Sequence, residues 1–139
     1  MFQLRRPSAE EVTAFIATQR GATFSYPEVG ATKSGAAPAG YDVDRNRVRL
    51  GTGAETFRRA TTAVHAWRMS SIGWMSIQPA NAPLSPSETV AAVVSHYGFW
   101  SLNACRVVYL LARLGSPLAR RLQRRFARES KQAMLAAVG

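Results

Sequence analysis

The residues best suited to nucleophilic chemistry are one histidine, which could act as a base, and two possible nucleophiles a few residues after it in the sequence. Ser101 and Cys105 lie a short distance after His96. If a hairpin brings them together, the imidazole could serve as the base for the hydroxyl or the thiol. No acidic residue lies nearby in the sequence to orient the imidazole, and none of the usual nucleophile motifs is present. We therefore favour a structural role for His96, and a non-enzymatic protein over an enzyme.

Metal and phosphate chemistry find little support in the sequence. One cysteine and two distant histidines, His65 and His96, do not make a metal site, and no cofactor is predicted. The segment Gly51-Thr52-Gly53 could form a phosphate loop between a strand and a helix. It lacks a third glycine in step and a following Gly-Lys-Ser/Thr, and Glu55 would repel an anion. A tight turn is the better interpretation.

Arginine supplies most of the unusual charge of the chain. The sequence holds 18 Lys and Arg against 8 Asp and Glu, a net charge of +10. Much of the excess falls in the C-terminal part, where a helical face would carry a candidate anion patch. That patch is Arg121, Arg124, Arg125 and Arg128. A solvated helix face is the alternative. Nucleic-acid binding is possible, but the sequence contains no motif of a known nucleic-acid-binding module.

Aromatic side chains could line a pocket for a small apolar or amphipathic molecule. The predicted lining is Tyr26, Tyr41, Trp74, Trp100, Asn103 and Tyr109. Aromatic residues at helix or strand spacing are more often plain core, so both interpretations stay open.

The elements that must position these residues follow from periodicity. Helices are predicted over 8–20, 54–68 and 117–138, the first from the Ser8/Glu11 capping-box spacing. Strands are predicted over 41–50, 72–78, 89–96 and 103–111, with a hairpin or bend at 97–102. The 139 residues are predicted to form one α+β domain. The shared helical stripes predict one core of Phe57, Val64, Trp67, Leu118, Leu122 and Phe126.

Several stretches resemble the uncharacterised bacterial and plant family DUF1990. They are Ser25-Tyr26-Pro27-Glu28-Val29-Gly30, Tyr41-x-Val43-Asp44, Leu50-Gly51-Thr52-Gly53, Gly98-Phe99-Trp100-Ser101-Leu102-Asn103-Ala104-Cys105-Arg106-Val107-Val108-Tyr109 and Leu118-Ala119-Arg120-Arg121-Leu122-Gln123-Arg124-Arg125-Phe126. The resemblance implies a START-like, helix-grip fold, in which an antiparallel sheet wraps a long C-terminal helix over an apolar cavity. Family members carry further strands between the Val107-Val108-Tyr109 strand and that helix, so an internal block is missing here. The family has no established activity and implies no catalytic residues.

The missing block leads to an expectation about partners. Nothing after the strand at 103–111 can pair with it, and it is apolar on both faces near its end. We therefore expect an exposed sheet edge and self-association through it. The preferred function is a binding module for a small hydrophobic ligand. The alternatives are an internally deleted relative with no activity of its own, or a basic binder of nucleic acid or anionic surfaces.

The compartment is predicted from the cysteine count and the start of the chain. Cys105 stands alone, so no internal disulfide can form, and a reducing cytoplasm is expected. No apolar run approaches the roughly 20 residues of a transmembrane helix, and the N-terminal residues do not read as a secretory signal.

Overall fold

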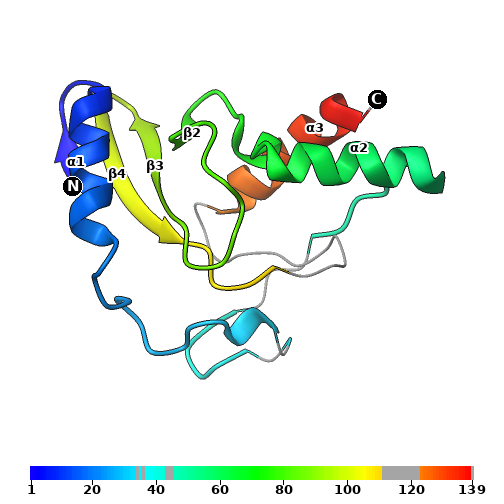
Figure 1. The fold of residues 1–139 in the computed structure, drawn as a ribbon, viewed down its shortest axis with the longest axis horizontal. Helices are drawn as coiled ribbons and strands as arrows, with labels where there is room; N and C mark the ends of the chain where they lie inside the picture. The colour runs from blue at the N-terminus through cyan, green and yellow to red at the C-terminus, as the bar shows by residue number, and fades with distance from the viewer. Residues whose placement is uncertain (34, 36, 43–45, 111–122, 139) are drawn as a thin grey trace.

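The chain folds into an antiparallel sheet with one helix on it and a separate pair of helices beside it (Figure 1). The computed structural model describes residues 1–33, 35, 37–42, 46–110 and 123–138. The strands are β1 (Phe2–Gln3), β2 (Met75–Gln78), β3 (Thr89–His96) and β4 (Phe99–Arg106). The helices are α1 (Ala9–Gln19), α2 (Gly53–His65) and α3 (Gln123–Val138), with short 3-10 turns η1 (Ala31–Lys33) and η2 (Arg68–Ser70). The α+β class is confirmed.

The first helix begins where its capping signal places it. The Ser8 hydroxyl accepts from the Glu11 N–H at 3.2 Å, and the Glu11 carboxylate accepts from the Ser8 N–H at 2.7 Å. These two bonds satisfy backbone donors that a helix start otherwise leaves without partners. The predicted helix over 8–20 is therefore confirmed to within one residue at each end.

The sheet has the order β1-β4-β3-β2, with every neighbouring pair antiparallel. Strands β3 and β4 form a continuous ladder from Thr89 opposite Arg106 to His96 opposite Phe99. Only Tyr97 and Gly98 remain for the turn, and Gly98 has φ +101°, which a residue without Cβ adopts at little cost. The predicted hairpin between two strands is therefore confirmed, but its predicted bounds, with the connection over 97–102 and the second strand over 103–111, are wrong. Strand β4 starts at Phe99 and ends at Arg106.

Two further sequence predictions differ from the structure. Residues 41–42 and 46–50 lie outside any strand, and residues 43–45 are outside the described part. The predicted strand alternates arginine with few apolar residues, so neither face offers a surface to bury against the core. The short strand β1 was missed, because two residues are too few to show a period. Its Phe2 and Gln3 pair with Ser101 and Trp100 of β4.

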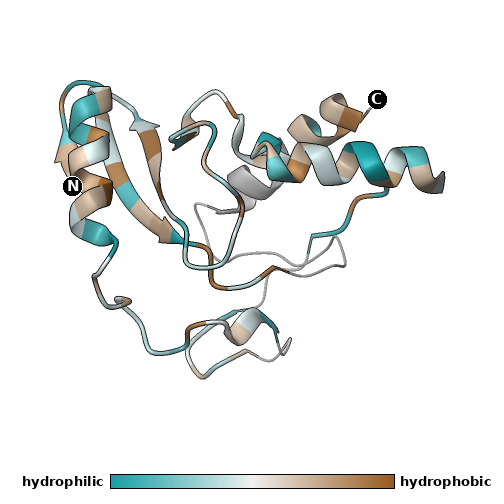
Figure 2. Cartoon of the chain, in the orientation of Figure 1, coloured by the Kyte–Doolittle hydropathy of each residue, from teal (hydrophilic) through white to brown (hydrophobic). Residues whose placement is uncertain are grey.

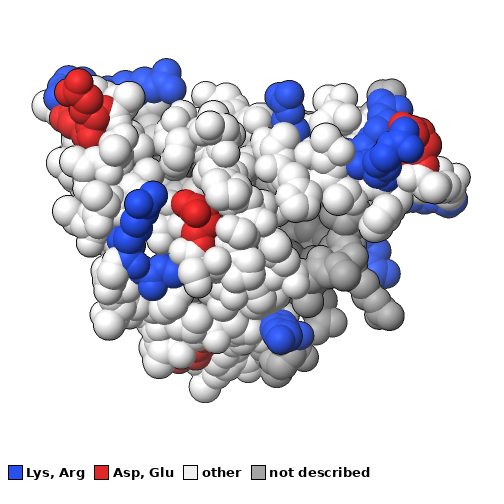
Figure 3. Space-filling model, viewed as in Figure 1, with Lys and Arg blue, Asp and Glu red and all other residues white. Residues whose placement is uncertain are grey.

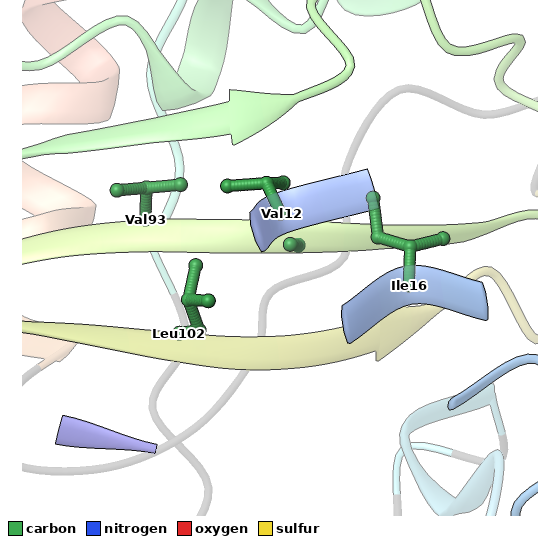
Figure 4. Close-up of a cluster of buried hydrophobic side chains, with 5 residues drawn as sticks. Val12, Ile16, Val93 and Leu102 are labelled. Atoms are coloured by element: carbon green, nitrogen blue, oxygen red, sulfur yellow. The ribbon is translucent and has the colours of Figure 1, made fainter. Parts of the chain in front are cut away.

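One hydrophobic cluster joins α1 to the sheet. Val12 and Ile16 of α1 pack on Val93 of β3 and Leu102 of β4, as Figure 4 shows. Ala91 completes the buried set, and Phe15 and Trp100 pack against its margin. In Figure 2 the hydrophobic colour marks segments of β3 and β4, whereas α2 carries several hydrophilic positions.

A second hydrophobic cluster joins the two other long helices. It comprises Ala60 and Ala63 of α2 with Met134 and Val138 of α3. The Ser130 hydroxyl also donates to the Met69 carbonyl of η2. The main contacts of the C-terminal helix are thus with α2 and η2, and the helix that lies on the sheet is α1.

The predicted single core is only partly realised. Phe57 is 57% exposed and lies outside both clusters, whereas Val64 packs against the second one. The Trp67 indole N–H donates to the Ala82 carbonyl at 2.9 Å, which ties the end of this region to the loop after β2. Leu118 and Leu122 lie outside the described residues, as does the side chain of Phe126.

Candidate functional site

A groove of about 430 Å³ runs along α1, where the helix meets the sheet. We call it the α1 groove. Its lining residues are Arg6, Pro7, Ala9, Val12, Thr13, Ile16, Ala17, Arg20, Gln78, Pro79 and Val93. Val12, Ile16 and Val93 are buried members of the first cluster, so the floor is apolar. This volume falls within the range of small-molecule sites in proteins.

The two ends of the α1 groove carry arginines. Arg6 precedes the helix, and its guanidinium lies 5.6 Å from the centroid of the Trp100 ring, within cation–π range. Arg20 follows the last helical residue. Within the part of the chain that the structure describes, neither arginine forms an ion pair.

One carboxylate close to Arg6 in the chain, that of Glu11, is already engaged. Arg5 donates to both carboxylate oxygens of Glu11, at 2.9 and 2.7 Å. The hydrogen bonds from Arg5 and from the Ser8 N–H lower the pKa of Glu11, and the same pair raises the pKa of Arg5. The positive charge of Arg6 is therefore not neutralised by Glu11.

The six residues predicted to line a pocket are spread over the molecule. Tyr109 shares a hydrogen bond with Thr32, and Tyr41 donates to Glu28 at 3.0 Å, so both help to order the loops beside the sheet. The Tyr26 ring contacts that of Phe24. None of these three lines the α1 groove.

The other three predicted residues belong to the sheet or its margin. Trp74 precedes β2, and its carbonyl accepts from the Ser95 N–H at 2.7 Å. Asn103 lies on β4, where its amide donates to the Ser101 hydroxyl at 3.0 Å. Trp100 adjoins the α1 groove through Arg6.

The predicted meeting of His96 with Ser101 does occur. His96 Nε2 lies 2.8 Å from Ser101 Oγ, while its ring stacks on Phe99 with centroids 4.8 Å apart. Ser101 is only 2% exposed, so its hydroxyl satisfies buried polar groups and is closed to a substrate. Desolvation raises the pKa of the Cys105 thiol, which opposes formation of a reactive thiolate.

The glycine segment leads directly into α2, which begins at Gly53 after the N-cap residue Thr52. Gly51 has φ +137°, and a Cβ there would lie 2.9 Å from the Thr56 side chain, so this position favours glycine for a structural reason. Glu55 pairs with Arg58 in the first turn of α2.

The basic residues are spread over the one face of the molecule that Figure 3 shows. On the face that Figure 3 shows, Lys and Arg lie in several separate places, some beside Asp or Glu. Arg121 is outside the described residues. Arg124, Arg125 and Arg128 fall on α3, but their side chains are also outside the description, so the anion patch stays a prediction.

The described residues include neither a metal-binding cluster nor a membrane-spanning helix. No cluster of His, Cys, Asp and Glu there could hold a metal ion. No helix in that part of the chain is long and apolar enough to cross a membrane.

Comparison with known families places the chain. A family model described as a domain of unknown function, DUF1990, matches residues 25–113. The chain belongs to the DUF1990 family. The matched segment begins after α1 and ends just after the sheet, so it includes β2, β3, β4 and α2 but not the helix that forms the α1 groove.

Two similar proteins align with more of this chain than the family model does. A UPF0548 protein from Dictyostelium discoideum is 31% identical over 119 residues, covering 79% of this chain and 55% of the relative. A UPF0548 protein from Deinococcus radiodurans is 36% identical over 123 residues, covering 80% of this chain and 61% of the relative. The chain thus spans little more than half the length of these relatives. No solved structure matches it significantly.

The arginines of the groove were not singled out from the sequence. The groove combines residues of α1 with Gln78 and Pro79 at the end of β2. No local sequence pattern indicates that these two distant segments come together.

Proposed function

We propose that this DUF1990 protein is a non-enzymatic binding module for a small apolar or amphipathic molecule, and that the α1 groove holds it. The observation that carries the proposal is the groove itself, about 430 Å³ with an apolar floor and polar ends. The family resemblance implies a cavity under the C-terminal helix. The groove lies under α1 instead, because α3 packs with α2 and η2.

The chemistry of the lining supports binding more than catalysis. The floor offers methyl and methylene groups, and the rim offers guanidinium, hydroxyl and amide groups that can orient a ligand. The pair best suited to proton transfer, His96 with Ser101, lies outside the groove lining. His96 is stacked on Phe99, and Ser101 is buried.

A pair of matched variants tests the proposal. Ala17 lines the α1 groove, whereas Ala14 is exposed on the same helix and does not. We expect Ala17→Trp to fill the groove and Ala14→Trp to leave it open. The probe is the neutral dye N-phenyl-1-naphthylamine, whose fluorescence rises in apolar sites.

The expected result is saturable dye binding to the unmodified chain and to Ala14→Trp, with binding to Ala17→Trp weakened about tenfold or more. Thermal melts should show that both variants remain folded. Equal dye binding by the two variants would place the dye elsewhere and contradict the proposal.

A further inference from the structure

The charges along the α1 groove define which amphipathic molecules it would prefer. Arg6 and Arg20 stand at opposite ends of a helix of 11 residues, which rises about 16 Å along its axis. Between them the floor is apolar. A ligand that satisfies this arrangement has an elongated apolar body, with any anionic group at an end.

The Arg6 end is the better prepared of the two for an anion. The Arg6 guanidinium lies over the half-buried ring of Trp100. Because Trp100 packs against the first cluster, its ring gives the guanidinium a fixed position. Arg5 takes up both oxygens of Glu11, so this carboxylate does not neutralise Arg6. A pre-positioned guanidinium can bind a carboxylate or phosphate through two parallel hydrogen bonds.

The Arg20 end is electrostatically less favourable. The carbonyl groups at the end of α1 point toward it, and these carry the negative end of the helix dipole. Arg106 covers part of this region by donating to the carbonyls of Gln19, Arg20 and Ala22, at 2.8, 2.8 and 2.9 Å. The Arg106 guanidinium at this end is therefore engaged with carbonyl oxygens of the chain itself.

We propose that the ligand of the α1 groove is an elongated amphipathic anion, with its carboxylate or phosphate head on Arg6 and its apolar tail along α1 toward Arg20. This assignment rests on the proposed function. It adds the charge of the ligand, its direction in the groove and the residue that selects it.

The experiment compares ligands that share one tail and differ in the head. Dodecanoate, dodecyl phosphate and dodecanol are titrated below their aggregation concentrations, by displacement of N-phenyl-1-naphthylamine. The chains compared are the unmodified protein, Arg6→Gln, Arg6→Lys and Arg20→Gln. Arg59→Gln serves as the matched control, because Arg59 is an exposed arginine of α2 outside the groove.

We expect the unmodified chain to bind at least one of the two anions about tenfold or more tightly than the alcohol. Arg6→Gln should remove this preference, and Arg6→Lys should restore part of it. Arg20→Gln and Arg59→Gln should keep the preference. The ratio between dodecanoate and dodecyl phosphate then identifies which oxyanion the site selects.

Three outcomes would overturn the assignment. If dodecanol binds as tightly as both anions, the head-group assignment fails while the proposed function stands. If Arg20→Gln removes the preference and Arg6→Gln does not, the direction in the groove is wrong. If none of the three ligands displaces the dye from a chain that binds it, the groove does not hold such molecules, and the assignment fails.

Discussion

Among the side chains that the structure describes, Arg106 makes several polar contacts between distant parts of the chain. Besides its three bonds to the carbonyls after α1, its Nε donates to the Thr89 hydroxyl at 3.4 Å. Its guanidinium also lies 5.0 Å from the centroid of the Phe24 ring. Helix ends leave carbonyl groups without partners, and here a strand residue supplies the donor. Arg106 therefore fixes the C-terminal end of α1 to the sheet.

Replacing this residue should destabilise the fold. We expect Arg106→Ala to lower the free energy of unfolding by about 2 kcal/mol, because hydrogen bonds from a charged donor are lost and carbonyls near α1 lose their partner. Urea unfolding followed by circular dichroism measures the change. The control is Arg59→Ala, an exposed arginine of α2, which should change stability little. Equal effects of the two substitutions would show that the contacts of Arg106 contribute nothing specific.

Leu102 of β4 is the largest of the most deeply buried side chains in the first cluster. It is 2% exposed and shares this cluster with residues of α1 and β3. We expect Leu102→Ala to destabilise the protein by about 2–5 kcal/mol, since a buried cavity remains. The control is Leu135→Ala on α3, where the leucine is 42% exposed. A Leu102→Ala variant as stable as the control would contradict the packing of α1 on the sheet.

Among the elements, those with local signals were predicted correctly. Helix α1 carries its start signal in Ser8 and Glu11, and strand β3 is a continuous apolar run bounded by turns. Helix α2 was predicted slightly too long, to residue 68. It ends at His65, and Trp67 has a left-handed backbone with φ +55°.

The elements that failed depend on partners distant in the chain. Strand β1 exists because β4 offers it an edge, and the β4 start depends on the tight turn at Gly98. The sequence of 41–50 has strand-like alternation, but residues 41–42 and 46–50 belong to no strand. For the same reason the α1 groove could not be predicted, whereas the contact between His96 and Ser101 followed from the hairpin alone.

The capping box at the start of α1 gives the helix a dependence on pH. The folded state lowers the pKa of Glu11 from its ordinary 4.5. A lowered pKa means that the ionised carboxylate stabilises the fold above the unfolded value and that this stabilisation is lost as the pH falls through the folded value. We expect Glu11→Gln to flatten this acid-side loss, measured by urea unfolding between pH 7 and about pH 3. An unchanged acid profile in the variant would contradict the role of this carboxylate. Glu10→Gln is the control, from the same helical turn.

Across the whole molecule, the sheet keeps one edge that is only partly covered by another strand. On its outer side β4 pairs with β1 at Trp100 and Ser101, and the Leu102 N–H donates to the Met1 carbonyl at 2.9 Å. The structure describes no further strand on that side beyond Leu102. An edge with free backbone groups can recruit another chain, so self-association remains our expectation.

The edge can be tested by adding one charge to it. We expect light scattering of the unmodified chain to show a mass that rises with concentration, and Ala104→Lys on β4 to shift the chain toward monomer, since an edge lysine opposes strand pairing. Ala54→Lys on α2 carries the same change away from the sheet. A monomer at every concentration, with a melt independent of dilution, would show that the short sheet suffices by itself.

The division into two hydrophobic clusters has a consequence for thermodynamic linkage. A ligand in the α1 groove contacts only the first cluster and its rim, so its binding would suppress sub-global opening of α1, β3 and β4 by mass action. The pairing of α2 with α3 shares no residue with that cluster or with the groove. Amide hydrogen exchange with and without saturating ligand would then slow in one cooperative unit and stay unchanged in the other. The protein would thus report ligand binding through local protection rather than through a change in shape.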